Sequence, residues 1–322
     1  MRYKSFIIVA TAIFVFFSEA FCYDSYMYQI NRYESSSINL EKKYPERYRV
    51  LYGKVKDYFS KNEFDAVMSK KTGIEIDETH QKKLIFITSP RSRKMQKQQH
   101  KDYVPILVNK KTLAKGKVFF KDYERYLKSA YEKTGVVPGD IIAVLNWESR
   151  LGKYRGTYTI FKLFVGQYFY IDELEKELYR KGAYKKKGAT LRKKAMKRIK
   201  KLKKNALSNL SHLLMQSKNK GFDPFKVKGS WAGAIGIPQF MPKSMKFAGD
   251  GDGDGVIDLN TMPDAIMSVA SYLMLHEYHE KKKKHAFRSY NPEDMYVRGV
   301  MMYSEKIERM GVKPLRGWVY LK

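Results

Sequence analysis

Three aspartates alternate with glycines in the segment Asp250-Gly251-Asp252-Gly253-Asp254-Gly255. Carboxylates at the first, third and fifth places of a loop converge on one hard cation, and a glycine at the sixth place permits the sharp turn of such a loop. The number and type of ligands favour Ca2+ over Mg2+. Without a counter-ion the carboxylates would repel one another, so the sequence favours a calcium loop over a flexible Gly-Asp linker.

Later residues of the same loop supply further oxygen ligands. The backbone carbonyl of Val256 stands at the seventh place and the carboxylate of Asp258 at the ninth. The twelfth place, where Glu is usual, holds Thr261. We therefore expect Asp264 to close a slightly longer loop, at the start of an apolar helix, around an ion whose role is structural.

A different kind of acidic residue lies within an apolar helix. In the segment IIAVLNWESRLG, residues Ile141, Val144, Leu145 and Glu148 fall on one face. Burial of a carboxyl group against apolar neighbours disfavours its charged form and raises its pKa. A carboxyl that stays protonated near neutral pH can donate a proton to a departing sugar oxygen, as a glycosidase acid does. The alternative is an ion pair that serves packing only, with Arg150, Lys153 or Arg155 as the partner.

The elements that position these residues are predicted to be mainly helical. Residues 119–134 have the pattern of an amphipathic helix, and Pro138 suits the start of the next one, which carries Glu148 and ends at Gly152. Residues 23–89 predict a further helical layer. No segment is rich in strand-forming residues and no internal repeat is present. The expected fold is therefore mainly α, with irregular loops that carry the Gly and Asp clusters.

Together these segments resemble the membrane-bound lytic murein transglycosylase B family. The resemblance runs from about residue 103 to the C-terminus, and three motifs occur in the family's order and spacing. They are E-S-R-L-G at 148–152, G-S-W-A-G-A-I-G-I-P-Q-F-M-P at 229–242 and Y-N-x-x-x-x-Y at 290–296. The resemblance implies an α+β, lysozyme-like fold that is mainly helical, with an EF-hand-like calcium loop and lytic transglycosylase activity on peptidoglycan.

The resemblance also implies roles for individual residues. Glu148 matches the family's single catalytic acid, and Ser230 matches a serine that orients a water, the substrate or the acid itself. The residues that match sugar-contacting positions are Tyr103, Gln239, Phe240, Met241, Tyr272, Tyr290, Asn291 and Tyr296. The calcium ligands fall on Asp250, Asp252, Asp254, the carbonyl of Val256, and Asp264. Taken singly, each could serve packing instead, and Ser230 could cap a helix.

The implied reaction needs only one acid. Ordinary glycosidases use two carboxylates that flank the bond, and the sequence offers no convincing second one. The resemblance implies that Glu148 protonates the oxygen between N-acetylmuramic acid and N-acetylglucosamine, and then assists closure of a 1,6-anhydro ring. Two alternatives stay open: a hydrolytic muramidase on the same scaffold, and a non-catalytic peptidoglycan-binding or scaffold protein.

The first residues are typical of a secretory signal peptide. Arg2 and Lys4 precede an uncharged apolar run over residues 6–17, which is shorter than the roughly 20 residues that a membrane span needs. We expect cleavage after Cys22, the only cysteine, and a periplasmic protein; lipidation of Cys22 is the alternative. The predicted organisation is a signal peptide at 1–22, a mostly helical region at 23–102 that packs on the core, and a catalytic domain at 103–322.

The net charge of +30, from 63 Lys and Arg against 33 acids, favours a polyanionic partner. Export makes nucleic acid an unsuitable partner, so we expect a monomer that binds peptidoglycan strands. Much of the excess charge lies in residues 180–204, which look unlike the family's connection at this point. Such a run is usually a solvated helix face or loop, and here it suggests an inserted helix that contacts the wall or an anionic membrane.

Overall fold

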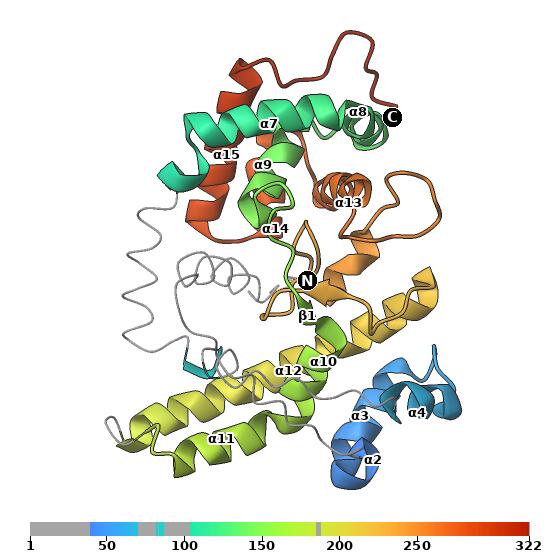
Figure 1. The fold of residues 1–322 in the computed structure, drawn as a ribbon, viewed down its shortest axis with the longest axis vertical. Helices are drawn as coiled ribbons and strands as arrows, with labels where there is room; N and C mark the ends of the chain where they lie inside the picture. Colours follow the sequence, from blue (N-terminus) through green and yellow to red (C-terminus); the bar gives the residue numbers. More distant parts are fainter. Residues whose placement is uncertain (1–38, 70–81, 83, 87–103, 185–187, 322) are drawn as a thin grey trace, which may run out of the picture.

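Helices dominate the computed structural model, which describes residues 39–69, 82, 84–86, 104–184 and 188–321 (Figure 1). The predicted signal peptide and Tyr103 lie outside these residues. None of the helices in the described part of the chain combines the length and the apolar character that crossing a membrane requires.

The helices fall into two groups along the chain. Before residue 185 they are α2 (Leu40–Lys43), α3 (Pro45–Val55), α4 (Lys61–Ser69), α7 (Lys110–Asp122), α8 (Glu124–Thr134), α9 (Pro138–Ser149), α10 (Ile160–Val165), the π-helical turn η1 (Gly166–Tyr170) and α11 (Ile171–Arg180). After residue 187 they are α12 (Gly188–Lys220), the 3-10 helix η2 (Pro242–Phe247), α13 (Met262–Met274), the 3-10 helix η3 (Glu280–Lys282), α14 (Lys284–Tyr290) and α15 (Asp294–Arg309).

Helix α9 carries Glu148 and lies among the helices in the upper half of Figure 1, which include α7, α8, α13 and α15. All 12 of its residues are buried, and it packs against α7, α8, α13 and α15. The sequence predicts one apolar face, but the helix is buried on every side, as expected for a helix surrounded by others. Gly299 of α15 lets α15 approach α9 closely, because a Cβ at this position would lie only 1.9 Å from a ring atom of Trp147 on α9.

The C-terminal end of α9 differs from the prediction. The helix ends at Ser149, three residues before Gly152, because Arg150 and Leu151 adopt left-handed backbone conformations with φ of 52° and 58°. The amide of Leu151 donates to the carbonyl of Leu145 (3.1 Å), which also accepts from the Ser149 hydroxyl (3.2 Å), so the helix end is closed by hydrogen bonds. Glu148 therefore lies in the last turn of α9, where its side chain can reach a neighbouring loop.

The predicted helix over residues 119–134 is wrong as a single element. Tyr123, with φ −116° and ψ 21°, separates α7 from α8, and α7 begins earlier than expected, at Lys110. Asn109 and Thr112 form reciprocal side-chain to backbone bonds that start α7. The change of direction allows α7 to pack on α9 and α15 while α8 packs on α13, so tertiary packing overrides a continuous amphipathic pattern.

The lower half of Figure 1 contains helices α10, α11 and α12. A short sheet joins this part to the helices around α9. Strands β1 (Tyr158–Thr159) and β2 (Lys228–Gly229) pair antiparallel, with Tyr158 opposite Gly229. Helices α10, η1 and α11 follow β1, and the long helix α12 leads back toward β2. The mainly α fold class with a minor β element is therefore confirmed.

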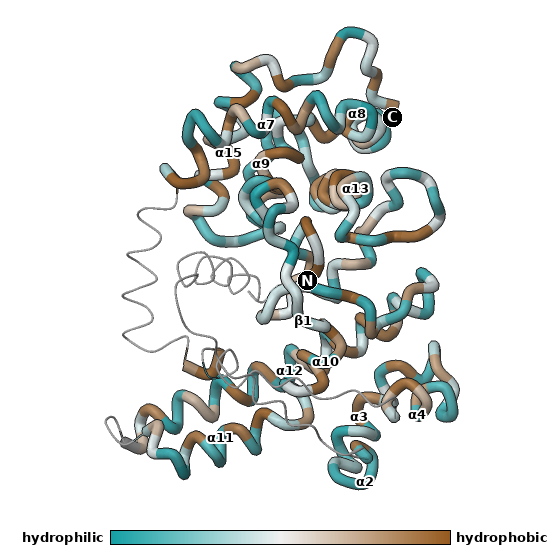
Figure 2. The backbone as a smooth tube through the Cα atoms, viewed as in Figure 1, coloured by the Kyte–Doolittle hydropathy of each residue, from teal (hydrophilic) through white to brown (hydrophobic). Residues whose placement is uncertain are grey.

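The basic segment at residues 180–204 is a helix over most of its described length. Residues 188–204 form the N-terminal half of α12, and α12 buries Ala195, Ile199 and Leu202 against α11 and residues 84–85. Figure 2 shows hydrophobic and hydrophilic segments interleaved along α11 and α12. Helices α3 and α4 share the main apolar core with α9, through buried residues such as Tyr48, Leu51 and Phe64.

Candidate active site

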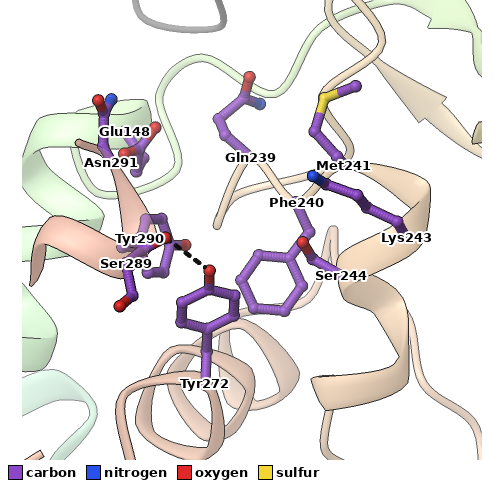
Figure 3. Close-up of a pocket in the computed structure, with 10 residues that line it drawn as sticks. All are labelled: Glu148, Gln239, Phe240, Met241, Lys243, Ser244, Tyr272, Ser289, Tyr290 and Asn291. Atoms are coloured by element: carbon purple, nitrogen blue, oxygen red, sulfur yellow. Dashed lines mark hydrogen bonds between the residues drawn. The ribbon is translucent and has the colours of Figure 1, made fainter. Parts of the chain in front are cut away.

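A pocket lies where the end of α9 meets the segment before η2 and helices α13 and α14 (Figure 3). Ten residues line it: Glu148, Gln239, Phe240, Met241, Lys243, Ser244, Tyr272, Ser289, Tyr290 and Asn291. Seven of these were predicted from the sequence, and they come from four separate stretches of the chain. The structure thus brings together the E-S-R-L-G, Q-F-M-P and Y-N motifs.

Glu148 is a buried acid without a cationic partner among the described residues. Glu148 is 6% exposed, and burial raises the pKa of its carboxyl group to about 8, an effect that the nearby Tyr296 hydroxyl partly opposes. Arg155, one candidate for an ion pair, instead donates to the carbonyls of Gly152 (3.0 Å) and Asn260 (3.1 Å). At neutral pH Glu148 is therefore mostly protonated and able to act as an acid.

Three aromatic rings pack together in the pocket. The ring centroid of Tyr272 lies 5.5 Å from that of Phe240 and 4.8 Å from that of Tyr290. The Tyr272 hydroxyl donates to the carbonyl of Ser289 (2.8 Å; dashed line in Figure 3), and the Tyr290 hydroxyl donates to the carbonyl of Pro238 (2.5 Å). These bonds fix the ring orientations, and fixed aromatic faces suit the apolar faces of sugar rings.

Gln239 is held in an unusual conformation. Its φ of 54° lies in the left-handed region, and its side-chain Nε2 donates to the carbonyl of Gly236 (2.6 Å). The side-chain Oε1 is buried and has no hydrogen-bond partner within the described structure. A buried acceptor of this kind costs free energy unless a ligand supplies the donor, and backbone strain of this kind is typical of functional sites. Gln239 can therefore accept a hydrogen bond from a hydroxyl or amide of a bound sugar.

Two other predicted site residues do not line the pocket. Tyr296 lies close to Glu148, and its ring is in edge contact with Trp147 and stacked at 6.3 Å on Tyr290. Ser230 is buried, and its Oγ accepts a hydrogen bond from the amide of Ala234 (3.1 Å), so it closes a turn and caps no helix. A role for Ser230 in orienting water or substrate stays a prediction.

Three pocket residues were missed by the sequence reasoning: Lys243, Ser244 and Ser289. A signal was available, because Lys243 and Ser244 follow the Q-F-M-P motif directly and Ser289 precedes the Y-N motif. A motif fixes the path of the backbone, so side chains next to it also reach the pocket.

The aspartate loop has the geometry of a cation site. Asp250, Asp252 and Asp254 each offer a carboxylate oxygen, and these oxygens lie within 4.8 Å of one another. Backbone hydrogen bonds from Gly255 and Gly253 lower the pKa of Asp250, which favours the ionised form that a cation needs. Such a cluster of hard oxygen ligands fits Ca2+.

Asp264 closes this loop in a way that the sequence did not specify. Its two carboxylate oxygens accept hydrogen bonds from the backbone amides of Gly251 (2.8 Å) and Asp258 (2.7 Å), and the residue is almost fully buried. Asp264 thus ties both ends of the loop to the start of α13. Direct coordination of an ion by Asp264, and by the carbonyl of Val256, stays a prediction.

The chain is similar to known proteins over most of its length. The sequence profile described as "Transglycosylase SLT domain" matches residues 53–318. The chain belongs to the transglycosylase SLT domain family. One relative, the membrane-bound lytic murein transglycosylase B of Escherichia coli (strain K12), is 33% identical over 162 residues, which are 50% of this chain. The match spans only 37% of that relative's length.

Solved structures of transglycosylases share the fold. The Escherichia coli lytic transglycosylase SLT35 in complex with calcium superposes with a TM-score of 0.60 at 18% identity, over 83% of this chain and 93% of that one. SltB3 from Pseudomonas aeruginosa in complex with NAG-anhNAM-pentapeptide gives a TM-score of 0.60 at 14% identity, over 85% of this chain and 81% of that one. At these identities the likeness concerns the family's fold.

Proposed function

We propose that the protein is a lytic transglycosylase that cleaves the β-1,4 bond between N-acetylmuramic acid and N-acetylglucosamine in peptidoglycan. The observation that carries the proposal is Glu148, a buried carboxyl with a pKa raised to about 8, in a pocket where none of the ten lining residues offers a second carboxyl group. A two-carboxylate glycosidase needs a partner at roughly 5 to 10 Å across the bond. A single acid suits a reaction in which the sugar provides its own nucleophile.

In this reaction Glu148 acts first as an acid and then as a base. It donates its proton to the glycosidic oxygen as the bond to the anomeric carbon breaks, and the neighbouring acetamido group stabilises the positive charge. The resulting carboxylate takes the proton of the sugar's 6-hydroxyl as that oxygen bonds to the anomeric carbon. The products are a free 4-hydroxyl and a 1,6-anhydro end, and no water is consumed. The attack is intramolecular, which gives a large effective-molarity advantage.

The remaining pocket residues are assigned to substrate binding. The rings of Phe240, Tyr272 and Tyr290 offer apolar faces, and the unpartnered Oε1 of Gln239 accepts a hydrogen bond from the sugar. Binding of NAG-anhNAM-pentapeptide by the relative SltB3 supports a substrate and product of this class.

The mass of the products distinguishes this proposal from hydrolysis. Purified sacculi are digested with the wild-type protein, and the muropeptides are weighed by mass spectrometry. Transglycosylation gives 1,6-anhydro ends that are lighter by one water than the reducing ends that a muramidase leaves. Reducing ends alone would establish the hydrolytic alternative. Sacculus binding without any release of muropeptides would establish a non-catalytic binding protein.

We also infer that the aspartate loop binds one structural Ca2+ through Asp250, Asp252 and Asp254. The complex of the relative SLT35 with calcium and the close approach of these three carboxylates support this inference. When bound, the ion neutralises the carboxylates and holds the loop against α13, the helix that also carries Tyr272. The ion is assigned no part in the chemistry.

The partners and location follow from the same proposal. We propose a monomer that is exported to the periplasm by residues 1–22, with lipidation of Cys22 as the alternative to cleavage. Six lysines of α12 are exposed on one side of the helix and form no ion pair within the described structure: Lys193, Lys194, Lys197, Lys200, Lys201 and Lys204. This face suits contact with the anionic wall, and loss of sacculus binding at high salt would test it.

A further inference from the structure

Lys243 places a positive charge in the pocket that the proposed chemistry does not use. It is the second residue of η2, directly after Pro242, and its side chain lines the same pocket as Glu148. The residue is only partly exposed. Burial and the neighbouring charge of Lys246 both lower the pKa of the Lys243 ammonium group. The charged form is thus costly until an anion reaches it.

The described part of the protein contains no partner for this ammonium group, in contrast to the lysines around it. Lys220 donates to the carbonyl of Ala248 (3.4 Å), and the Lys246 ammonium lies 4.7 Å from the ring centroid of Phe247. Lys243 forms neither an ion pair nor a hydrogen bond with any described residue. A partly desolvated cation that faces a ligand pocket without an internal partner is suited to bind an anion of the ligand.

Lys243 lies away from the reacting end of the pocket. In Figure 3 Glu148 and Asn291 occupy one side, and Lys243 and Met241 occupy the other. The pKa of Glu148 is set by its burial and by Tyr296, with no contribution from the charge of Lys243. The ammonium group therefore acts on a part of the ligand that is separated from the bond being broken.

We propose that Lys243 binds a carboxylate carried by the glycan strand and makes the protein selective for acidic strands. This inference rests on the proposed function, since it concerns the same pocket. The carboxylate has two possible sources: the lactyl group of muramic acid where no peptide is attached, and the stem peptide where one is. A lysine offers a single point charge that suits a lone carboxylate on a mobile group, with no demand for two-point geometry.

The test compares three forms of the strand. The first has its stem peptides removed, which frees the lactyl carboxylates; the second retains its peptides; the third has all carboxyl groups converted to methyl amides. The wild-type protein, Lys243→Met, Lys243→Arg and Lys246→Met are assayed for kcat/KM on each. Lys246→Met is the matched control, because it removes one positive charge from the same turn at an exposed position outside the pocket.

We expect Lys243→Met to lower kcat/KM about tenfold on at least one of the two acidic strands. The difference from the wild type should shrink to about twofold on the amidated strand. The acidic strand that shows the loss identifies the source of the carboxylate. Lys243→Arg should recover most of the activity because it keeps the charge. An equal loss on all three strands, no loss on either acidic strand, or the same loss for Lys246→Met would overturn the proposal.

A binding measurement separates this result from the proposed function. The dissociation constants of the acidic and amidated strands are measured in the Glu148→Gln background, with and without Lys243→Met, by calorimetry. Tighter binding of an acidic strand should depend on Lys243, whether or not the wild-type protein turns that strand over. If wild-type digests contain no anhydro ends but this dependence holds, the proposed reaction fails and the carboxylate site stands. Identical constants for acidic and amidated strands would remove the site.

Discussion

Helix α9 carries two buried carboxyl groups with very different surroundings. Asp140 lies in its first turn and Glu148 in its last, about 12 Å apart along the helix axis. Asp140 pairs with the ammonium of Lys283 (2.9 Å) and accepts hydrogen bonds from the hydroxyls of Tyr278 and Ser304. Glu148 has no cation near it among the described residues, and the Tyr296 hydroxyl is the one described group that lowers its pKa.

This difference separates a structural acid from a reactive one. Burial raises the pKa of Asp140, while the Lys283 ammonium and the bonds from Ser304 and Tyr278 oppose that rise. These partners join α9 to α15 and to the segment between α13 and α14, so the carboxylate serves to fix helices together. Glu148 lacks such compensation, and its proton stays available for transfer. The lesson is that the partners of a buried acid, more than burial itself, indicate its role.

The largest expected effect comes from removing the unpaired acid. Glu148→Gln keeps the shape of the side chain but has no transferable proton, so release of muropeptides from sacculi should fall about a thousandfold. Product release is followed by chromatography, and circular dichroism confirms that the helices remain. Glu305→Gln, an exposed acid on α15, serves as the control and should retain full activity. Substantial lysis by Glu148→Gln would remove Glu148 from the catalytic role.

Removing the cation that pairs with Asp140 should make that residue resemble Glu148. Lys283→Met leaves a buried carboxyl without its charge partner, which should lower the free energy of unfolding by about 3 to 5 kcal/mol at pH 8. Asp140 becomes neutral when it takes up a proton, so the loss in free energy of unfolding should be smaller at pH 4.5. Urea unfolding at both pH values measures it, with the exposed neighbour Lys282→Met as the control. The same loss at both pH values would show that packing, and not charge pairing, is what Lys283 contributes.

Glu148 should itself reduce stability at high pH. Because its pKa rises from 4.5 to about 8 on folding, the folded protein holds a proton that the unfolded chain has lost, and stability falls as pH rises from about 4.5 to 8. The whole shift corresponds to roughly 5 kcal/mol, and solvent in the pocket reduces this. Glu148→Gln should therefore be about 3 kcal/mol more stable than the wild type at pH 9 and similar at pH 4. A gain that does not vary with pH would contradict the raised pKa.

The two acids also show how far the sequence could predict this protein. The apolar stripe around Glu148 predicts its burial, and the three motifs predict most of the pocket, because both depend on local pattern and order along the chain. The partners of Asp140 could not be found in this way. Lys283 and Ser304 lie more than 140 residues away and reach Asp140 only through tertiary packing, which places α15 and the residue before α14 against α9.

The errors in the predicted elements have the same origin. Nothing local requires the chain to change direction at Tyr123, and the break follows from the separate partners of α7 and α8. Likewise α9 ends at Ser149 because two non-glycine residues adopt left-handed conformations, which the pattern of a helix ending in glycine does not foresee. The sequence predicts a helix or a loop for residues 180–204, and the structure shows a helix over most of the described part; the outward orientation of its six lysines depends on contacts with α11.

The smallest effect is expected at the aspartates of the calcium loop. These acids are more exposed than Asp140 and Glu148, and their main unfavourable interaction is repulsion between their charges. In the presence of Ca2+, Asp254→Ala should lower the free energy of unfolding by about 1 to 2 kcal/mol. An ion that binds only the folded loop stabilises the folded protein, and removal of one carboxylate weakens the binding of that ion. With a chelator the sign should reverse or the difference vanish, since the variant then has one fewer of three mutually repelling carboxylates. Thermal unfolding of both proteins in Ca2+, Mg2+ and chelator measures this. A loss of stability that persists unchanged in the chelator would mean that Asp254 supports the loop through the hydrogen bond that its carboxylate accepts from the Val256 amide, and that no ion is involved.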